Sequence, residues 1–341
     1  MKRVVLMLAA AAATAFAATA SAQTLNTVKQ RGILNCGANG SLGGFGLPDA
    51  QGNWTGLDVD FCRALAAAIF NDPTKVKFVA LTAKDRFTAL QSGDVDVLAR
   101  NTTWTSSRDT SLGLNFTGVN YYDGQGFMVR KSLKVNSALE LNDAAVCVQQ
   151  GTTTELNLAD YFRANKMKLK TVTFASADEA IKAYDAGRCD AFTTDASGLY
   201  AERLRLAKPD DHMVLPEIIS KEPLGPSVRH GDDQWFDIVK WTHFAMLIAE
   251  ELNITKANVD EQLKTTTIPD AKRLLGTEGN YGEQLGLTKD WAYRIIKHVG
   301  NYGEIFDKNV GMGSPLKIQR GLNALWTASP KPGLQYAPPI R

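Results

Sequence analysis

The stretch LDVDFCRALAAAIFNDPTKVKFVAL, residues 57–81, decides the fold. Its first fourteen residues carry apolar side chains at helical spacing, which predicts an amphipathic helix over 57–70. The side chains on the apolar face of this helix are Val59, Cys62, Leu65, Ala66 and Ile69. VKFVAL at 76–81 follows a short polar turn and predicts a strand. Helix and strand therefore alternate at this point in the chain.

The same alternation continues on both sides of this stretch. GILNCGAN at 32–39 predicts a strand, KDRFTALQSG at 84–93 a helix, and VDVLAR at 95–100 a further strand. This βαβαβ order is typical of a parallel sheet with helices on both faces. A second series of strands and helices runs from AAVCVQQG at 144–151 to CDAFTTD at 189–195. We therefore expect two α/β units in tandem.

Two glycine-containing segments join these units and divide the chain. YYDGQGFMVRK at 121–131 is a pliable first crossing, and KEPLGPSVRHGDDQW at 221–235 is the second. We expect a first lobe from 23–123, completed by the returning chain at 225–341, and a second lobe at 124–224. Ligands bind outside the carboxyl ends of parallel strands, so the predicted site is the cleft between the lobes.

The end of the chain differs from the two α/β units. After the second crossing the pattern is mainly helical, so the first lobe should carry an extra C-terminal helical segment. The last stretch, SPKPGLQYAPPIR at 329–341, is rich in proline, and we expect it to lie extended on the surface.

The first residues indicate export. MKR, an apolar run and the small residues ASA at 20–22 predict a signal peptide over 1–22, cleaved after Ala22, and hence a protein that is soluble outside the cytoplasm. A membrane anchor is the alternative, although the alanine-rich run is short for a span. Lys2 and Arg3 account for the formal net charge of +2, so the remaining chain is neutral. With no long run of like charge, we expect no nucleic-acid binding.

The cysteine content fits an oxidising compartment. The four cysteines are Cys36, Cys62, Cys147 and Cys189, and they allow three pairings. Pairing near neighbours predicts Cys36–Cys62 and Cys147–Cys189. Free core thiols remain an alternative, and the spacing disfavours a metal site.

Polar residues follow the strand at 95–100. In RNTTWTSSRD, residues 100–109, Arg108 could take a carboxylate in two parallel hydrogen bonds, with Thr103 and Thr105 as further donors. The alternative is structural, because Thr105 also fits an N-terminal helix cap with Arg108 in solvent.

Two further strand ends carry polar residues in the second unit. QQGTTTEL at 149–156 begins a helix, and a helix N-terminus binds anions, but Thr152 with Glu155 also fits a capping box. Asp195 ends the strand CDAFTTD and could pair with an ammonium group, or cap the next helix. Together with Arg108 these sites complement a zwitterion: carboxylate to Arg108, Thr103 and Thr152, ammonium to Asp195.

Several features limit the function. Phe45 and Trp104 are candidate apolar walls of the site, although Trp104 could equally be core. The four histidines are scattered, and the G-x-S-x-G, H-E-x-x-H and P-loop motifs are missing from the sequence. We therefore expect a binding protein without catalytic residues, metal or cofactor.

Long blocks of this sequence resemble the periplasmic solute-binding proteins of polar amino-acid ABC transporters, and within them the general L-amino-acid-binding proteins. The resemblance covers nearly the whole chain after the signal peptide. It rests on blocks such as RFTALQSGDVDVL, NTTWTSSRD, VCVQQGTTTELNLADYF, AYDAGRCDAFTTD and EIISKEPLGPSVRHGDDQWFDIVKW. It implies a type II periplasmic-binding-protein fold, with two α/β lobes on a two-strand hinge.

The resemblance also assigns roles to residues. It implies that Arg108 and Thr103 bind the α-carboxylate, that Thr152 and Thr153 assist, and that Asp195 binds the α-ammonium. The full predicted ligand-binding set is Asn39, Phe45, Arg86, Asn101, Thr103, Trp104, Arg108, Thr152, Thr153 and Asp195. Where family members place an aromatic ring after the first strand, this chain has Leu42, with Phe45 further on.

The implied function is that of a monomeric receptor that closes on one L-amino acid and docks on a membrane permease. Broad specificity follows from the resemblance. Arg86 and Arg100, near the predicted cleft, could favour acidic or amide side chains, or could form salt bridges between the lobes. The alternatives are an enzyme on the same scaffold, such as a small-acid dehydratase, and a sensor domain.

Overall fold

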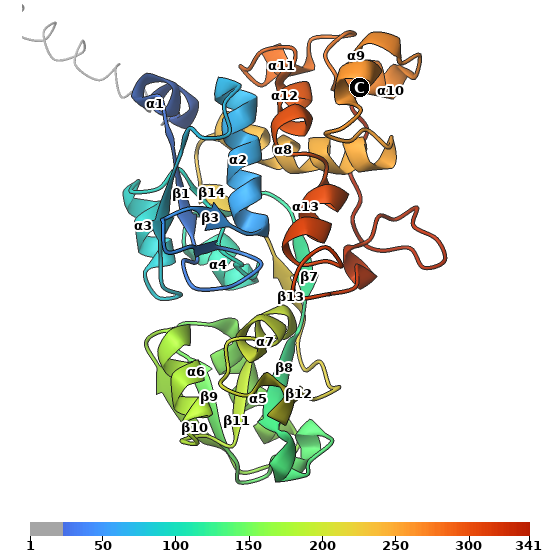
Figure 1. The fold of residues 1–341 in the computed structure, drawn as a ribbon. Coiled ribbons are helices and arrows are strands. Elements are labelled where there is room, and N and C mark those ends of the chain that lie inside the picture. The colour runs from blue at the N-terminus through green and yellow to red at the C-terminus, as the bar shows by residue number, and fades with distance from the viewer. Residues whose placement is uncertain (1–22) are drawn as a thin grey trace, which may run out of the picture.

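A computed structural model describes residues 23–341, and it consists of two lobes joined by a pair of strands (Figure 1). The predicted signal peptide lies outside the described residues. No helix in the described part is long and apolar enough to span a membrane.

The first lobe is built on a five-stranded sheet. Its strands, in spatial order, are β4 (Val76–Ala80), β1 (Leu34–Ala38), β5 (Val97–Leu98), β14 (Ser227–Arg229) and β6 (Leu114–Phe116). β1 pairs in parallel with β4 and β5, whereas β14 is antiparallel to β5 and β6. The returning chain therefore inserts into the sheet between β5 and β6. The helices of this part are α1 (Thr24–Arg31), α2 (Leu57–Phe70), α3 (Arg86–Ser92) and α4 (Ser106–Ser111), and β2 (Leu47–Pro48) pairs with β3 (Trp54–Thr55).

The second lobe repeats this order. Its strands, in spatial order, are β10 (Lys170–Phe174), β9 (Ala145–Gln149), β11 (Ala191–Asp195), β8 (Gln125–Arg130) and β12 (His212–Val214). Its helices are α5 (Thr153–Ala164), α6 (Ala177–Asp185) and α7 (Ala196–Arg203). β9 is parallel to β10 and β11, and the antiparallel β8 leads in from the hinge. The α/β prediction for both units is confirmed.

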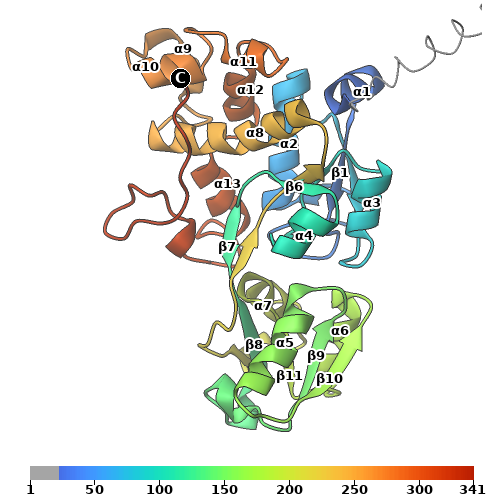
Figure 2. The same ribbon diagram turned by 180° about the vertical axis from the view of Figure 1, so that it is seen from behind.

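The hinge consists of β7 (Tyr121–Asp123), paired antiparallel with β13 (Glu222–Leu224). Seen from behind, these two strands run side by side between the lobes (Figure 2). In their register Glu222 lies opposite Asp123. The two-strand hinge prediction is therefore confirmed.

The polypeptide after β14 packs on the first lobe. Its helices are α8 (Asp233–Glu251), α9 (Val259–Thr265), α10 (Pro269–Leu274), α11 (Tyr281–Gln284), α12 (Trp291–His298) and α13 (Tyr302–Asn309). Trp235, Trp291 and Tyr302 are each 1% exposed and share one core with α2. The predicted helical segment is therefore part of the lobe.

The expectation that 329–341 lies on the surface is wrong in part. The segment has no helix or strand, but Gln335, Ala337 and Ile340 are buried. The Gln335 amide donates to the Val119 carbonyl at 3.2 Å, and Ile340 joins the large core. Proline content predicted the irregular backbone correctly but carried no information about which side chains face the lobe.

Both predicted disulfides are present. Cys36–Cys62 joins β1 to α2, and Cys147–Cys189 joins β9 to the residues just before β11. Each lobe thus has one cross-link between an interior strand of its sheet and a neighbouring element.

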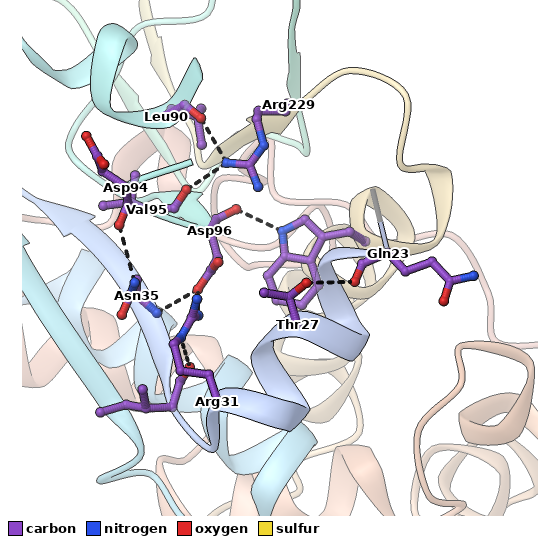
Figure 3. A network of polar contacts seen from close by, with 11 residues as sticks. Gln23, Thr27, Arg31, Asn35, Leu90, Asp94, Val95, Asp96 and Arg229 are labelled. Carbon is purple, nitrogen blue, oxygen red and sulfur yellow. Dashed lines mark hydrogen bonds and ion pairs between the residues drawn. The ribbon is translucent and has the colours of Figure 1, made fainter. Parts of the chain in front are cut away.

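A polar network fixes the end of the first sheet that lies away from the cleft (Figure 3). The Asp96 carboxylate accepts hydrogen bonds from the Asn35 N–H at 2.7 Å and from Arg31. The main-chain carbonyl of Asp96 accepts from the Trp235 indole N–H at 2.9 Å. Arg229 donates to the main-chain carbonyls of Leu90 and Val95. The start of β5 is therefore held, and the residues after it enter the cleft in a fixed register.

Candidate functional site

A narrow cavity lies between the lobes and is lined by both. Its first-lobe residues are Asn39, Leu42, Arg86, Arg100, Asn101 and Thr103, and its second-lobe residues are Gln149, Thr152, Thr153, Thr154, Ala177, Phe192, Thr194, Asp195 and Glu202. The space open to water centres is about 40 Å³. One water needs roughly 10–15 Å³ by this measure, so the lobes must separate for a larger solute to enter.

Arg108 occupies the third position of α4, behind the cavity wall. The Thr105 hydroxyl accepts from its N–H at 3.3 Å, so the predicted helix cap is present. Arg108 is nevertheless only 8% exposed as a whole residue, and its guanidinium donates to the Thr103 carbonyl at 2.9 Å and lies 5.2 Å over the Phe87 ring. Burial lowers the pKa of Arg108, while Glu222 and Asp195 oppose this shift. The cap and a buried cation therefore coexist.

Arg86 and Arg100 are also buried, and these two residues line the cavity. Arg86 donates to the Thr102 hydroxyl at 3.3 Å, and its Nε has no hydrogen-bond partner within the described chain. Arg100 donates to the Leu81 carbonyl at 3.0 Å, and burial lowers its pKa to about 10. Burial, Arg100 and Arg108 lower the pKa of Arg86 as well. Within residues 23–341 none of the three forms a salt bridge, so the predicted alternative of inter-lobe salt bridges at Arg86 and Arg100 does not hold.

The N-terminus of α5 faces these cations from the second lobe. Thr152 caps the helix by accepting from the Glu155 N–H at 3.1 Å, and its own proton goes to the Gln149 carbonyl at 2.7 Å. The Glu155 carboxylate accepts from Gly151 instead of Thr152, so only half of the predicted capping box forms. The Thr152 hydroxyl is engaged, and the first N–H groups of α5 are the donors left without an acceptor inside the helix.

Asp195 ends β11 and is 8% exposed. No hydrogen-bond donor to its carboxylate occurs among residues 23–341, and it does not cap α7. Burial raises its pKa well above the usual range, and the carboxylates of Asp123 and Glu222 add to this effect. Arg86 and Arg108 oppose it without reaching ion-pair distance. The site therefore holds a buried acid that lacks a cation.

Glu222 is the central residue that the sequence analysis missed. It is fully buried on β13, and its Oε2 accepts from the Thr103 hydroxyl at 2.6 Å and the Thr153 hydroxyl at 2.8 Å. Its Oε1 accepts from Asn157 at 2.7 Å and Ser220 at 2.6 Å. A lone acid in the second crossing, KEPLGP, was the available signal.

Asn39 and Asn101 meet at the first-lobe wall. The Asn39 amide donates to Asn101 Oδ1 at 2.8 Å. Asn101 has a φ of 34°, and Asp58 holds its N–H at 2.7 Å. Burial raises the pKa of Asp58 to about 6. Asp58 therefore fixes a backbone turn that presents two carboxamides to the cavity.

The structure does not bring Phe45 and Trp104 to the cavity, which corrects the expectation that they wall it. Phe45 is 1% exposed and packs edge-on against Tyr121, and its carbonyl accepts from the Asp58 N–H at the start of α2 at 3.1 Å. Trp104 is 38% exposed and stacks on Phe116 at 5.7 Å, outside the cavity lining. Leu42 lines the cavity instead.

The arrangement can hold a small zwitterion but offers little for other chemistry. No group of three or more potential metal ligands comes together within residues 23–341. The buried residues Arg86 and Arg100 line the cavity together with Asp195, an acid without a hydrogen-bond donor in the described chain, whereas Arg108 is buried outside the lining. Such a site binds and encloses a solute.

Known proteins place the chain in a family. Residues 34–253 match the model of bacterial extracellular solute-binding proteins, family 3. The chain is 64% identical over 327 residues to the general L-amino acid-binding periplasmic protein AapJ of Rhizobium johnstonii, covering 95% of each. It is 54% identical over 341 residues to the glutamate/glutamine/aspartate/asparagine-binding protein BztA of Rhodobacter capsulatus, covering 100% of each.

A solved structure of similar sequence shares the whole architecture. It is an ABC transporter periplasmic binding protein from Brucella ovis with glutathione bound, at 63% identity and a TM-score of 0.91, covering 94% of this chain and 100% of that one. Relatives and structure agree over nearly the full length, including the helices after residue 253. The chain belongs to family 3 of the bacterial extracellular solute-binding proteins, and its two lobes form a type II periplasmic-binding fold.

Proposed function

We propose that this protein captures single L-amino acids in the cleft and delivers them to the permease of an ABC transporter. One observation carries the proposal: the cavity is lined by the buried residues Arg86, Arg100 and Asp195, and none of these three charged groups is within ion-pair distance of an opposite charge in the described part of the chain. An unpaired buried charge is costly, and a zwitterion of the right size would neutralise both signs.

The charges suggest how the amino acid lies. Asp195 takes the α-ammonium, and Arg108 with the first N–H groups of α5 takes the α-carboxylate. The predicted hydroxyl donors, Thr103 and Thr152, give their protons to Glu222 and Gln149. We therefore assign carboxylate binding to the guanidinium and to main-chain N–H groups.

The first-lobe wall supports a preference among side chains. Arg86 and Arg100 are buried cations, and Asn39 and Asn101 present carboxamides beside them. A carboxylate or carboxamide side chain would pair with these groups, which favours glutamate, aspartate, glutamine and asparagine. BztA is named for binding these four amino acids, and AapJ is named as a general binder.

The site offers no separate catalytic group. A dehydratase needs a general acid or base over the reacting part of the ligand. Asp195 is the strongest candidate, and pairing with the ammonium accounts for it. We propose a monomeric, periplasmic, non-catalytic receptor that returns its ligand unchanged, which mass spectrometry of ligand recovered after incubation would test.

Thermal melting with matched ligands tests the receptor function. L-Glutamate should raise the melting temperature, whereas glutarate, which lacks the ammonium, and 4-aminobutyrate, which lacks the α-carboxylate, should have little effect. A ligand at about 100 times its Kd stabilises by roughly 2.7 kcal/mol. Glutathione belongs in the panel because its glutamyl end carries the same zwitterion. If no L-amino acid raises the melting temperature, the proposal is wrong.

A further inference from the structure

Glu222 is a buried carboxylate that contacts both lobes. Its Oε2 accepts from Thr103 in the first lobe and from Thr153 at the start of α5 in the second. The two hydroxyl oxygens lie 3.3 Å apart. Main-chain hydrogen bonds connect its strand to the first lobe, since the Trp104 N–H donates to the Pro223 carbonyl at 2.8 Å.

Each oxygen of this carboxylate receives two donors. Asn157 of α5 and Ser220 supply the other pair, at 2.7 and 2.6 Å. A buried carboxylate is tolerated when its lone pairs are filled. Opening the cleft would separate the Thr103 segment from α5, so Glu222 would lose the donors of one lobe.

We propose that Glu222 is a positioning residue that couples lobe closure to capture. It draws together Thr103 and the N-terminus of α5, the two main-chain segments that flank the predicted carboxylate position. Without it the closed arrangement is less populated, and apparent affinity falls in proportion to the competent fraction. The effect on capture rests on the proposed function, whereas the effect on closure does not.

The closure test measures a distance between the lobes without ligand. Spin labels at Lys77→Cys and Ala164→Cys, both at exposed positions, report on the first and second lobe. All four native cysteines are in disulfides, so only these sites are labelled. We expect Glu222→Ala to shift the distance distribution toward more open lobes. Glu217→Gln, which removes a charge from the same segment but bonds only within the second lobe, should leave the distribution unchanged.

Glu222→Ala leaves the buried donors to this carboxylate without an acceptor, so a second pair of variants changes one donor instead. Thr153→Val removes one donor to Glu222 and should open the lobes, and Thr153→Ser should retain the parent distribution. If Glu222→Ala fails to fold, the comparison of Thr153→Val with Thr153→Ser tests the proposal by itself. Unchanged distances in both Glu222→Ala and Thr153→Val would overturn the proposal.

Calorimetry with L-glutamate then tests capture. Glu222→Ala should bind at least tenfold more weakly, a change of about 1.4 kcal/mol, and Thr153→Val should be non-additive with it in a double-mutant cycle. Equal affinity of variant and parent would overturn the coupling. If the parent binds no amino acid while the distances still shift, the proposed ligand is wrong and the role of Glu222 in closure stands.

Discussion

Asp195→Asn should have opposite effects on the ligand-free and the ligand-bound protein. The Asp195 carboxylate is buried without a donor, and its pKa is raised well above the usual range. A carboxyl whose folded pKa exceeds its unfolded pKa costs stability as pH rises through the folded value. The asparagine cannot ionise, so the ligand-free variant should be more stable than the parent at pH 8, and the gain should shrink near pH 4.

The expected gain in stability of ligand-free Asp195→Asn follows from the cost of burying a carboxylate without a hydrogen-bond donor. Leaving such a group buried costs about 1–3 kcal/mol, and 1 kcal/mol moves the melting temperature by about 2–4 °C in a large domain. We expect a rise of a few degrees for the ligand-free variant. The bond from the ammonium to a carboxylate is worth about 1.5–3 kcal/mol, so binding of L-glutamate should weaken by about 10- to 150-fold.

Calorimetric melting at pH 4 and pH 8, with and without L-glutamate, measures both effects. Asp160→Asn serves as the control because its carboxylate is 65% exposed in a surface pair with Arg163. That change should stay within about 0.5 kcal/mol. The reasoning is refuted if Asp195→Asn lowers the ligand-free melting temperature at pH 8, or if it binds L-glutamate as the parent does.

Three other perturbations follow from the same structure. Arg108→Ala should weaken the binding of all L-amino acids by a similar factor in calorimetry, because its proposed contact is to the carboxylate that they share; selective loss of acidic ligands would contradict this. Reduction of the Cys147–Cys189 disulfide, which joins residues 42 positions apart, should lower the free energy of unfolding by about 2–5 kcal/mol in a denaturant titration; an unchanged midpoint would argue against this. Asn323→Ala removes two hydrogen bonds to the Tyr122 backbone, and hydrogen exchange at Tyr122 should accelerate; equal protection would show that this contact does not hold the hinge.

Local patterns predicted the fold well because they depend on neighbours in sequence. The apolar spacing in 57–70 gave the bounds of α2, and near-neighbour pairing gave both disulfides. Asp195 was predicted as a ligand residue because a polar residue directly after a buried strand stands at the sheet edge that faces the cleft, and Arg108 was predicted from the polar run that follows β5.

The other features of the site could not be predicted, because they depend on contacts between residues that are far apart in the sequence. Glu222 meets Thr103 from 119 positions away, and nothing in KEPLGP indicates such a partner. Phe45 and Leu42 are both buried apolar residues of one glycine-rich loop, and only the turn of that loop decides which of them also lines the cavity. The hydroxyls of Thr103 and Thr152 were predicted to donate to the ligand carboxylate, but each donates to another residue of the chain.

The helical segment after the hinge restricts where the lobes can turn. The Asn323 side chain accepts from the Tyr122 N–H at 2.7 Å and donates to the Tyr122 carbonyl at 3.0 Å. Tyr302 donates to the Asn120 carbonyl at 2.8 Å. These bonds hold β7 to the first lobe as far as Tyr122, so we expect rotation of the lobes to begin at Asp123.

At that pivot three acids gather. Asp123 pairs with Glu222 across the hinge, and both act on Asp195; burial raises the pKa of Asp123 to about 6. A bound ammonium would relieve the repulsion at the point about which the lobes turn. Neutralising charge at the pivot would then favour the same closed arrangement that Glu222 holds, so ligand charge and hinge closure would act on one cluster of residues.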